Sequence, residues 1–158
     1  MKKRRTLASE WVLEGVGLHT GVPVRVRLRP AAPNSGIVFV RADLGGIRIP
    51  ALIENAGPSF YATVLQKDGA TVSTIEHLMA ALYAMQVDDL DIELDAAEAP
   101  ILDGSAKPFV EGILAAGFKE HDAIREYLHI TKPLTVTHED KRISVHPCSE
   151  YRVTYAID

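Results

Sequence analysis

A glutamate and a histidine stand side by side at positions 76 and 77, within a stretch that has helical periodicity. At a period of about 3.6 residues, one side of this helix collects the apolar residues Ile75, Leu78, Met79 and Leu82. His77 points roughly the other way. A buried imidazole needs a polar partner, and a metal ion is a common partner of histidine. The pair is therefore the first candidate for chemistry in this chain.

The helix that carries the pair is predicted to run from Ser73 to about Met85. His77 shares its face with small residues at offsets of three, four and seven, namely Ala80, Ala81 and Ala84. A helix that is apolar nearly all round is usually covered on both sides. We therefore expect His77 to face away from the sheet and another layer to pack closely against its face.

Both residues of the pair also have a structural interpretation. Ser73-x-x-Glu76 matches a capping box, in which Ser73 is the N-cap and the Glu76 carboxylate reaches back to the helix start. A single helical histidine is more often structural than a metal ligand. The spacing alone leaves these interpretations open beside the catalytic one.

Composition excludes several classes of protein. The chain has 158 residues, of which 47% are hydrophobic and 24% charged, as in ordinary globular proteins. A net charge of −4 argues against general nucleic-acid binding. The single cysteine, Cys148, excludes an internal disulfide framework and fits a reducing compartment. No stretch has the roughly 20 apolar residues of a membrane span, and no apolar signal core follows the basic start. We expect a soluble cytoplasmic protein without nucleic-acid binding or stable membrane insertion.

Strand and helix patterns together predict an α+β fold. Alternating or apolar runs predict strands at 11–13, 24–29, 37–40, 47–49, 60–65 and 90–94, and a second helix at about 106–116. We expect a two-layer sandwich, in which a mostly antiparallel or mixed sheet packs on the two helices. A polar linker is predicted at 120–125.

The strands predicted after the linker lack helices to cover them. They lie at 127–130, 134–137, 143–145 and 151–157. We therefore predict a first domain at 1–122 and, at 123–158, the opening strands of a second, similar domain. The apolar face formed by Tyr151, Val153, Tyr155 and Ile157 would be exposed or buried against another copy, so self-association is a further expectation.

Two glycine-containing segments stand outside these periodic elements. Residues 15–21, Gly-Val-Gly-Leu-His-Thr-Gly, form a loop whose glycines permit tight backbone geometry. It is not a dinucleotide-binding fingerprint, because a strand follows where a helix is required. His19 in this loop is either a surface histidine or part of a site. Asp103-Gly104-Ser105 reads as a tight turn before the second helix.

Five stretches in order resemble the zinc-dependent UDP-3-O-acyl-N-acetylglucosamine deacetylases of lipid A biosynthesis. They are Arg5-Thr6-Leu7, residues 15–21, Leu28-Arg29-Pro30-Ala31, Ser73-Thr74-Ile75-Glu76-His77-Leu78 and residues 100–106. The resemblance covers nearly the whole chain. It implies a two-domain α/β enzyme of roughly twice this length, whose active site lies between two halves that each pack a sheet on helices.

The resemblance also implies roles for individual residues. His77 matches a zinc ligand and Glu76 matches the general base, while the remaining ligands of the one Zn²⁺ are expected from a second half. Leu18, His19, Ser59 and Phe60 are the predicted contacts of the acylated UDP-sugar substrate. The Asp103, Gly104 and Ser105 turn is predicted to hold its shape near the site by bonding backbone amides.

Two alternatives to the deacetylase remain open. One is a non-catalytic, truncated homologue that binds a nucleotide sugar or a partner protein. The other is a packing domain in which Glu76 and His77 are only structural. Because His77 is the only ligand that the matched motif supplies here, we expect weak zinc binding and little activity from this chain alone.

Overall fold

The computed structural model describes residues 1–156, which form two compact units. The first unit is Met1–Arg125 and the second begins at Glu126. We predicted that residues 123–158 form the opening strands of a second, similar domain, and this stays a prediction.

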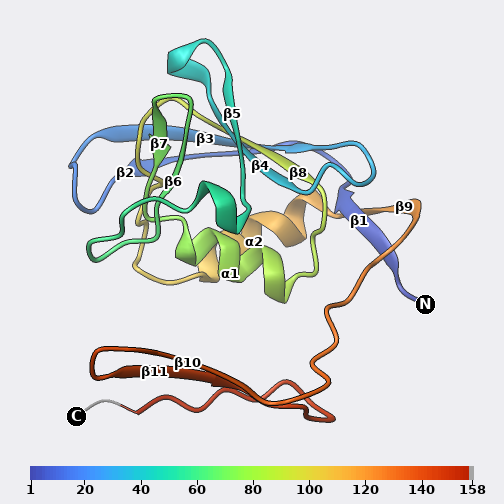
Figure 1. The fold of residues 1–158 in the computed structure, drawn as a ribbon. Coiled ribbons are helices and arrows are strands. Elements are labelled where there is room, and N and C mark those ends of the chain that lie inside the picture. The colour runs from blue at the N-terminus through green and yellow to red at the C-terminus, as the bar shows by residue number, and fades with distance from the viewer. Residues whose placement is uncertain (157–158) are drawn as a thin grey trace. The chain divides into compact units, whose positions relative to one another are not determined.

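A five-stranded mixed sheet forms the framework of the first unit (Figure 1). Its strands, in spatial order, are β2 (Trp11–Val16), β3 (Pro23–Pro30), β8 (Leu90–Leu94), β4 (Ile37–Arg41) and β5 (Ile47–Pro50). Only the β4–β8 pair is parallel. The alternation of β3 is clear, because Val24, Val26 and Leu28 are buried and the arginines between them pair with acidic side chains on the outer face.

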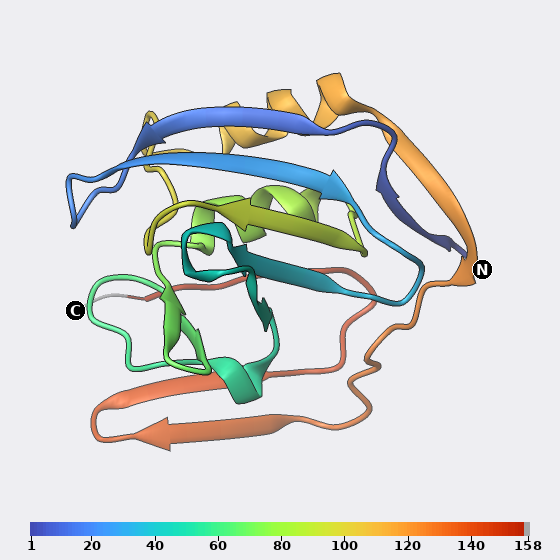
Figure 2. The ribbon, with the colours of Figure 1, turned by 90° about the horizontal axis from the view of Figure 1, so that it is seen from above.

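Two helices cover the inner face of this sheet (Figure 2). They are α1 (Glu76–Ala84) and α2 (Lys107–Ala116), and they contact each other. Between the helices and the sheet, the apolar side chains form one core whose largest fully buried members include Phe39, Ile92, Leu94, Leu82 and Phe109. The predicted α+β fold, a mixed sheet packed on two helices, is confirmed.

Two further strand pairs complete the first unit. They are β1 (Lys3–Leu7), which pairs with β9 (Phe118–Ile124), and β6 (Leu65–Lys67), which pairs with β7 (Ala70–Val72). Two short 3₁₀ helices lie at Ala42–Leu44 and Ile53–Asn55. The predicted linker at 120–125 is wrong, because most of it is β9, a polar strand that buries only His121. The strand predicted at 60–65 is also wrong, since only Leu65 belongs to one.

The second unit contains one antiparallel hairpin of β10 (Leu134–His138) and β11 (Lys141–Val145). All residues of both strands are exposed. Residues 127–130 and 151–156 are not in strands, so those two predictions are wrong for the described part, while Ile157 lies outside it. Their alternating apolar residues did not produce strands. Among the described residues neither segment has a partner strand, and an isolated strand leaves its backbone N–H and C=O groups unpaired. Among the helices of residues 1–156, none is long and apolar enough to cross a membrane.

Candidate active site

Helix α1 does not begin with the predicted capping box. Its N-cap position is Ile75, and no side chain caps it. Ser73 instead donates its hydroxyl to the carbonyl of Ala97 at 3.3 Å and its amide to the same carbonyl at 2.9 Å. Ser73 is therefore held by the segment after β8, which corrects the prediction that it is the N-cap.

The carboxylate of Glu76 points to a loop and not back to its own helix. Its Oε2 accepts a hydrogen bond from the backbone N–H of Thr63 at 3.0 Å. The Glu76 side chain is half-buried, and Thr63 is exposed. This bond orients the carboxylate at the surface of α1, next to His77 in the sequence.

His77 lies outside the core that holds Leu78 and Leu82. Those two leucines are buried, whereas His77 is half-buried and Ala80 and Ala84 are exposed. Ala81, which was predicted on the same face, is fully buried in the core, so that part of the prediction is wrong. Within the first unit, Met1–Arg125, no layer covers Ala80 and Ala84 on this face. The imidazole is therefore accessible from the open side of α1.

Glu98 was not recognised from the sequence motifs, yet its carboxylate accepts several hydrogen bonds close to the start of this helix. Only 1% of the residue is exposed. Its Oε1 accepts from the His19 N–H at 3.0 Å and from the Thr74 hydroxyl at 2.8 Å. Its Oε2 accepts from the N–H and the hydroxyl of Thr20, at 2.8 and 2.7 Å. One carboxylate thus joins the loop of His19 to the turn just before α1.

These hydrogen bonds decide the ionisation of Glu98. Burial disfavours the charged form, but the donors of His19, Thr20 and Thr74 outweigh it and lower the pKa of Glu98 to about 2. Gly17 is needed at this point, because a Cβ there would collide with Oε2 of Glu98 and the Thr20 hydroxyl. The sequence signal was weak: one acid among small apolar residues, Ala96-Ala97-Glu98-Ala99.

The segment around Glu98 also pairs through its backbone. Ala99 donates its N–H to the Ser73 carbonyl at 3.0 Å, and Ile101 donates to Val16 at 3.1 Å. The segment therefore crosses between the end of β2 and the entrance of α1. It brings the glycine-containing loop and the helix start together.

The Asp103 turn lies next along this segment. Asp103 Oδ1 accepts from the N–H and hydroxyl of Ser105, at 2.9 and 2.8 Å, and these bonds lower its pKa. Gly104 has a φ of 80°, in the left-handed region that favours glycine. The turn thus has the amide-bonding geometry predicted for it, and Leu102 just before it would meet a Cβ placed on Gly15.

The predicted substrate contacts lie in two exposed loops. Leu18 and His19 follow β2, and both side chains are exposed. Ser59 and Phe60 lie between the second 3₁₀ helix and β6, where Phe60 is 83% exposed. The His19 backbone is tied to the helix entrance through Glu98, and the second loop is tied to it through Thr63 and Glu76.

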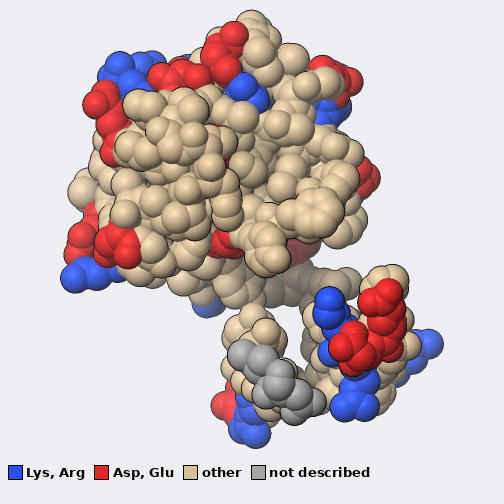
Figure 3. All heavy atoms as spheres, turned by 90° about the vertical axis from the view of Figure 1, so that its left-hand side faces the viewer, with Lys and Arg blue, Asp and Glu red and all other residues tan. Residues whose placement is uncertain are grey.

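An open apolar cavity of about 330 Å³ lies beside Glu76. Its walls include Leu52, Ile53, Val64 and Met79. Seen from the side where the β2–β3 loop lies in Figure 1, the first unit has a largely uncharged surface with Lys, Arg, Asp and Glu toward its rim (Figure 3). An uncharged rather than a strongly basic face surrounds the loops of the candidate site.

Residues 1–156 do not bring three or more His, Cys, Asp or Glu side chains together as a metal-binding group. What the start of α1 offers is one accessible imidazole, His77, with the carboxylate of Glu76 beside it. These donor types suit zinc, which takes histidine nitrogen and carboxylate oxygen and uses three protein ligands in catalytic sites. The described residues can therefore supply part of such a site.

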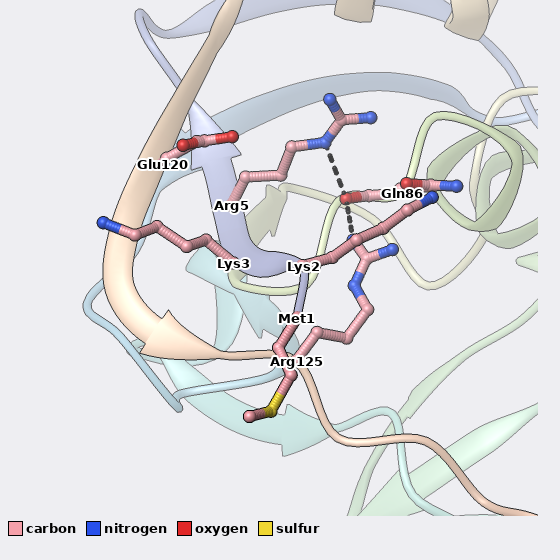
Figure 4. Close-up of a pocket in the computed structure, with 7 residues that line it drawn as sticks. All are labelled: Met1, Lys2, Lys3, Arg5, Gln86, Glu120 and Arg125. Carbon is pink, nitrogen blue, oxygen red and sulfur yellow. Dashed lines mark hydrogen bonds between the residues drawn. The ribbon is translucent and has the colours of Figure 1, made fainter.

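A larger cavity, of about 470 Å³, lies at the other end of α1 and has a structural explanation. The guanidinium groups of Arg5 and Arg125 both donate to the carbonyl of Gln86, just past the helix (Figure 4). Cations at a helix C-terminus satisfy its free carbonyls and interact favourably with the helix dipole. This basic cluster caps α1 and is separate from the candidate site.

Comparison with known proteins identifies the family. Residues 4–158 match the model of the LpxC family, UDP-3-O-acyl N-acetylglycosamine deacetylase. The chain belongs to this family.

Three curated relatives carry the name UDP-3-O-acyl-N-acetylglucosamine deacetylase. The chain is 48% identical to the one from Myxococcus xanthus over 98% of its length, 45% to that of Hahella chejuensis over 100%, and 46% to that of Solibacter usitatus over 89%. The aligned parts make up 50%, 53% and 48% of those relatives. The chain therefore spans about half the length of the curated relatives it matches.

Proposed function

We propose that this chain provides the N-terminal part of a zinc-dependent deacetylase that removes acetate from an acylated UDP-N-acetylglucosamine in lipid A biosynthesis, in the cytoplasm. The observation that carries the proposal is the start of α1, where Glu76 and His77 stand together on the open side of the helix. Family membership supplies the reaction class. The expected substrate is therefore the acylated UDP-sugar named in the relatives.

His77 would serve as one zinc ligand, with the remaining ligands from the rest of the enzyme. When bound, zinc lowers the pKa of water and stabilises negative charge on a carbonyl oxygen. The expected weakness of zinc binding by this chain alone follows from the ligand count, because a catalytic site uses three protein ligands.

Glu76 would act as the general base. The Thr63 N–H holds one carboxylate oxygen at 3.0 Å and so fixes the plane of the group. An oriented carboxylate beside the reacting centre can take the proton from the attacking water and return it to the leaving amine. The Leu18–His19 and Ser59–Phe60 loops would contact the substrate, because Glu98 and Glu76 attach both loops to the helix start.

The test joins residues 1–158 to the remaining half of the Myxococcus xanthus relative. We expect the joined protein to contain about one zinc and to release acetate from the acylated UDP-sugar. His77→Ala should reduce both zinc content and turnover, whereas the 158-residue chain alone should bind zinc weakly and show little turnover.

The controls separate the alternatives. Ala80→Ser, on the same open face, should leave zinc content and turnover unchanged. A folded, zinc-loaded joined protein that binds the UDP-sugar without turning it over would favour the non-catalytic homologue. Loss of folding in His77→Ala with unchanged zinc content per folded molecule would mean that the histidine is structural.

A further inference from the structure

Glu98 is buried and charged, yet its hydrogen-bond partners are all neutral. They are the backbone N–H groups of His19 and Thr20 and the hydroxyls of Thr20 and Thr74. No ion pair to Glu98 occurs among the described residues. Burying an unpaired carboxylate is costly unless several hydrogen bonds satisfy it. Such an arrangement needs all its donors in place at once.

The Thr74 end of this arrangement is strained. Thr74 has a φ of 56°, in a region that β-branched residues rarely occupy. It is 4% exposed, and its hydroxyl points to Oε1 of Glu98. A residue keeps such a conformation only when its surroundings fix it, and strain of this kind gathers at functional sites. Glu98 holds the side chain of Thr74, and the backbone bonds of Ser73 with Ala97 and Ala99 hold the residue before it.

The strained turn sets the direction of α1. Thr74 lies two residues before Glu76, and α1 begins at Glu76 without a side-chain cap. With no cap to define its first turn, the helix start depends on the pairing of Ser73 and on the Thr74 hydroxyl. A shift of Thr74 would therefore displace the carboxylate of Glu76 and the imidazole of His77.

We propose that Glu98 is a positioning residue, which acts through Thr74 on the Glu76–His77 pair and through two backbone amides on the Leu18–His19 loop. The proposal rests on the proposed function for its catalytic consequence. Glu98 would hold the substrate loop and the catalytic helix start in one fixed relation. Its loss would then lower kcat more than it raises KM, since a misplacement of about 1 Å can reduce a rate about 100-fold.

Asp89 is a matched control within the same unit. It is also buried, with 0% exposure, and it accepts hydrogen bonds from Arg4 and from the Gly36 N–H. It lies just before β8, whereas Glu98 follows β8. A substitution at Asp89 therefore removes a buried carboxylate, in this case one paired with Arg4, without removing a contact of the helix start.

The experiment compares Glu98→Gln, Thr74→Val and Thr74→Ser with Asp89→Asn. In the 158-residue chain, amide hydrogen exchange by NMR is measured at His19, Thr20, Ser73 and Met79, whose N–H groups are hydrogen-bonded to Glu98, Glu98, Ala97 and Ile75. Glu98→Gln should raise exchange at these amides by about 10- to 100-fold, because it weakens hydrogen bonds to a charged acceptor. In the joined enzyme, Glu98→Gln should lower kcat by about 100-fold.

Thr74 provides the second line of the test. Thr74→Val keeps the shape of the side chain but removes the hydroxyl, so it should reproduce the faster exchange at Ser73 and Met79. Thr74→Ser retains the hydroxyl and should restore slow exchange there. If Glu98→Gln does not fold, the comparison of Thr74→Val with Thr74→Ser still tests the inference.

Three results would overturn the inference, and two of them come from hydrogen exchange. One is exchange at the four amides that rises no more in Glu98→Gln than in Asp89→Asn. The other is equal exchange in Thr74→Val and Thr74→Ser. The exchange measurements need no turnover, so a joined enzyme without activity would reject the proposed function and leave this test intact. The third result is a normal kcat in Glu98→Gln when the unsubstituted joined enzyme is active, which would reject the positioning role of Glu98.

Discussion

Helices α1 and α2 pack on the same core, but they begin and end differently. Helix α2 starts with a proline in its first turn and ends at Gly117, whose φ of 71° and N–H bonds to Ile113 and Leu114 close the helix. The N-cap position of neither helix has a side-chain cap. Helix α1, however, starts two residues after a threonine with a φ of 56°, whereas the strained residue before α2, Leu102 with a φ of 54°, lies ahead of the Asp103–Ser105 turn. The Ser105 hydroxyl accepts from the Lys107 N–H at 3.1 Å at the start of α2.

The strained residue just before α1 indicates that the entrance of this helix is the functionally specialised part of the fold. Conflicts between local preference and observed structure tend to occur at functional or strained sites. The α1 entrance holds such a conflict in place through Glu98, and the residues next to it are Glu76 and His77. At the α2 entrance, the Asp103–Ser105 turn forms from neighbouring residues alone and involves no buried carboxylate.

The largest expected difference between the helices is catalytic. In the joined enzyme, Glu76→Gln should lower kcat by about 10²- to 10⁴-fold, the usual contribution of a general base. Glu111→Gln on α2 is the matched control, since Glu111 is exposed and pairs only with Lys107 at 3.8 Å. Steady-state rates of acetate release give the comparison. Equal rates in the two variants would remove Glu76 from the mechanism.

The next effect is the pH dependence of stability at the α1 entrance. The pKa of Glu98 is about 2 in the folded chain and 4.5 for the ordinary side chain. A lowered folded pKa stabilises the protein above the unfolded value, and the stabilisation is lost as pH falls from 4.5 toward about 2. The shift corresponds to about 3 kcal/mol.

Urea titrations between pH 6 and pH 2 (about the range in which carboxylates titrate) measure this effect. Glu98→Gln should flatten the dependence of the unfolding free energy on pH. Asp103→Asn, at the entrance of α2, should change it far less, because the Asp103 carboxylate is exposed. A Glu98→Gln curve parallel to wild type would show that folding does not lower the pKa of Glu98.

Periodic elements were predictable from sequence, and the connections between them were not. The alternation of β3 and β8 and the apolar stripe of α1 follow from burial of one face, so their residues carry the signal. Strand β9 carries none, because it pairs along one edge and buries little more than His121. Its existence depends on β1, which is distant in the sequence.

The candidate site divides in the same way. Glu76 and His77 stood out because they are adjacent and open a periodic helix. Glu98 could not be recognised, since its donors come from residues 19, 20 and 74 and only the folded chain brings them together. Ser73 matched a capping box by spacing alone, but the pairing of its backbone with Ala97 and Ala99 uses the residue elsewhere.

The smallest expected effect concerns packing on the second helix. Gly112 on α2 lies against the ring of Trp11, and a Cβ at this position would overlap the ring atoms. Alanine normally favours a helix over glycine by about 1 kcal/mol, yet overpacking typically costs about 1–3 kcal/mol. We therefore expect Gly112→Ala to destabilise the chain, whereas Ala80→Leu on the open face of α1 should be neutral within about 0.5 kcal/mol.

Urea unfolding followed by the fluorescence of Trp11, the single tryptophan, measures both variants. The double variant Trp11→Phe/Gly112→Ala identifies the cause, because a smaller ring leaves room for the methyl group. If overlap with Trp11 is the cause, the two substitutions together should destabilise by less than their separate effects combined, since residues in contact are not additive; the double variant is followed by circular dichroism. Additive effects would mean that Gly112 is required for another reason, and a stabilising Gly112→Ala would show that β2 can move away from α2.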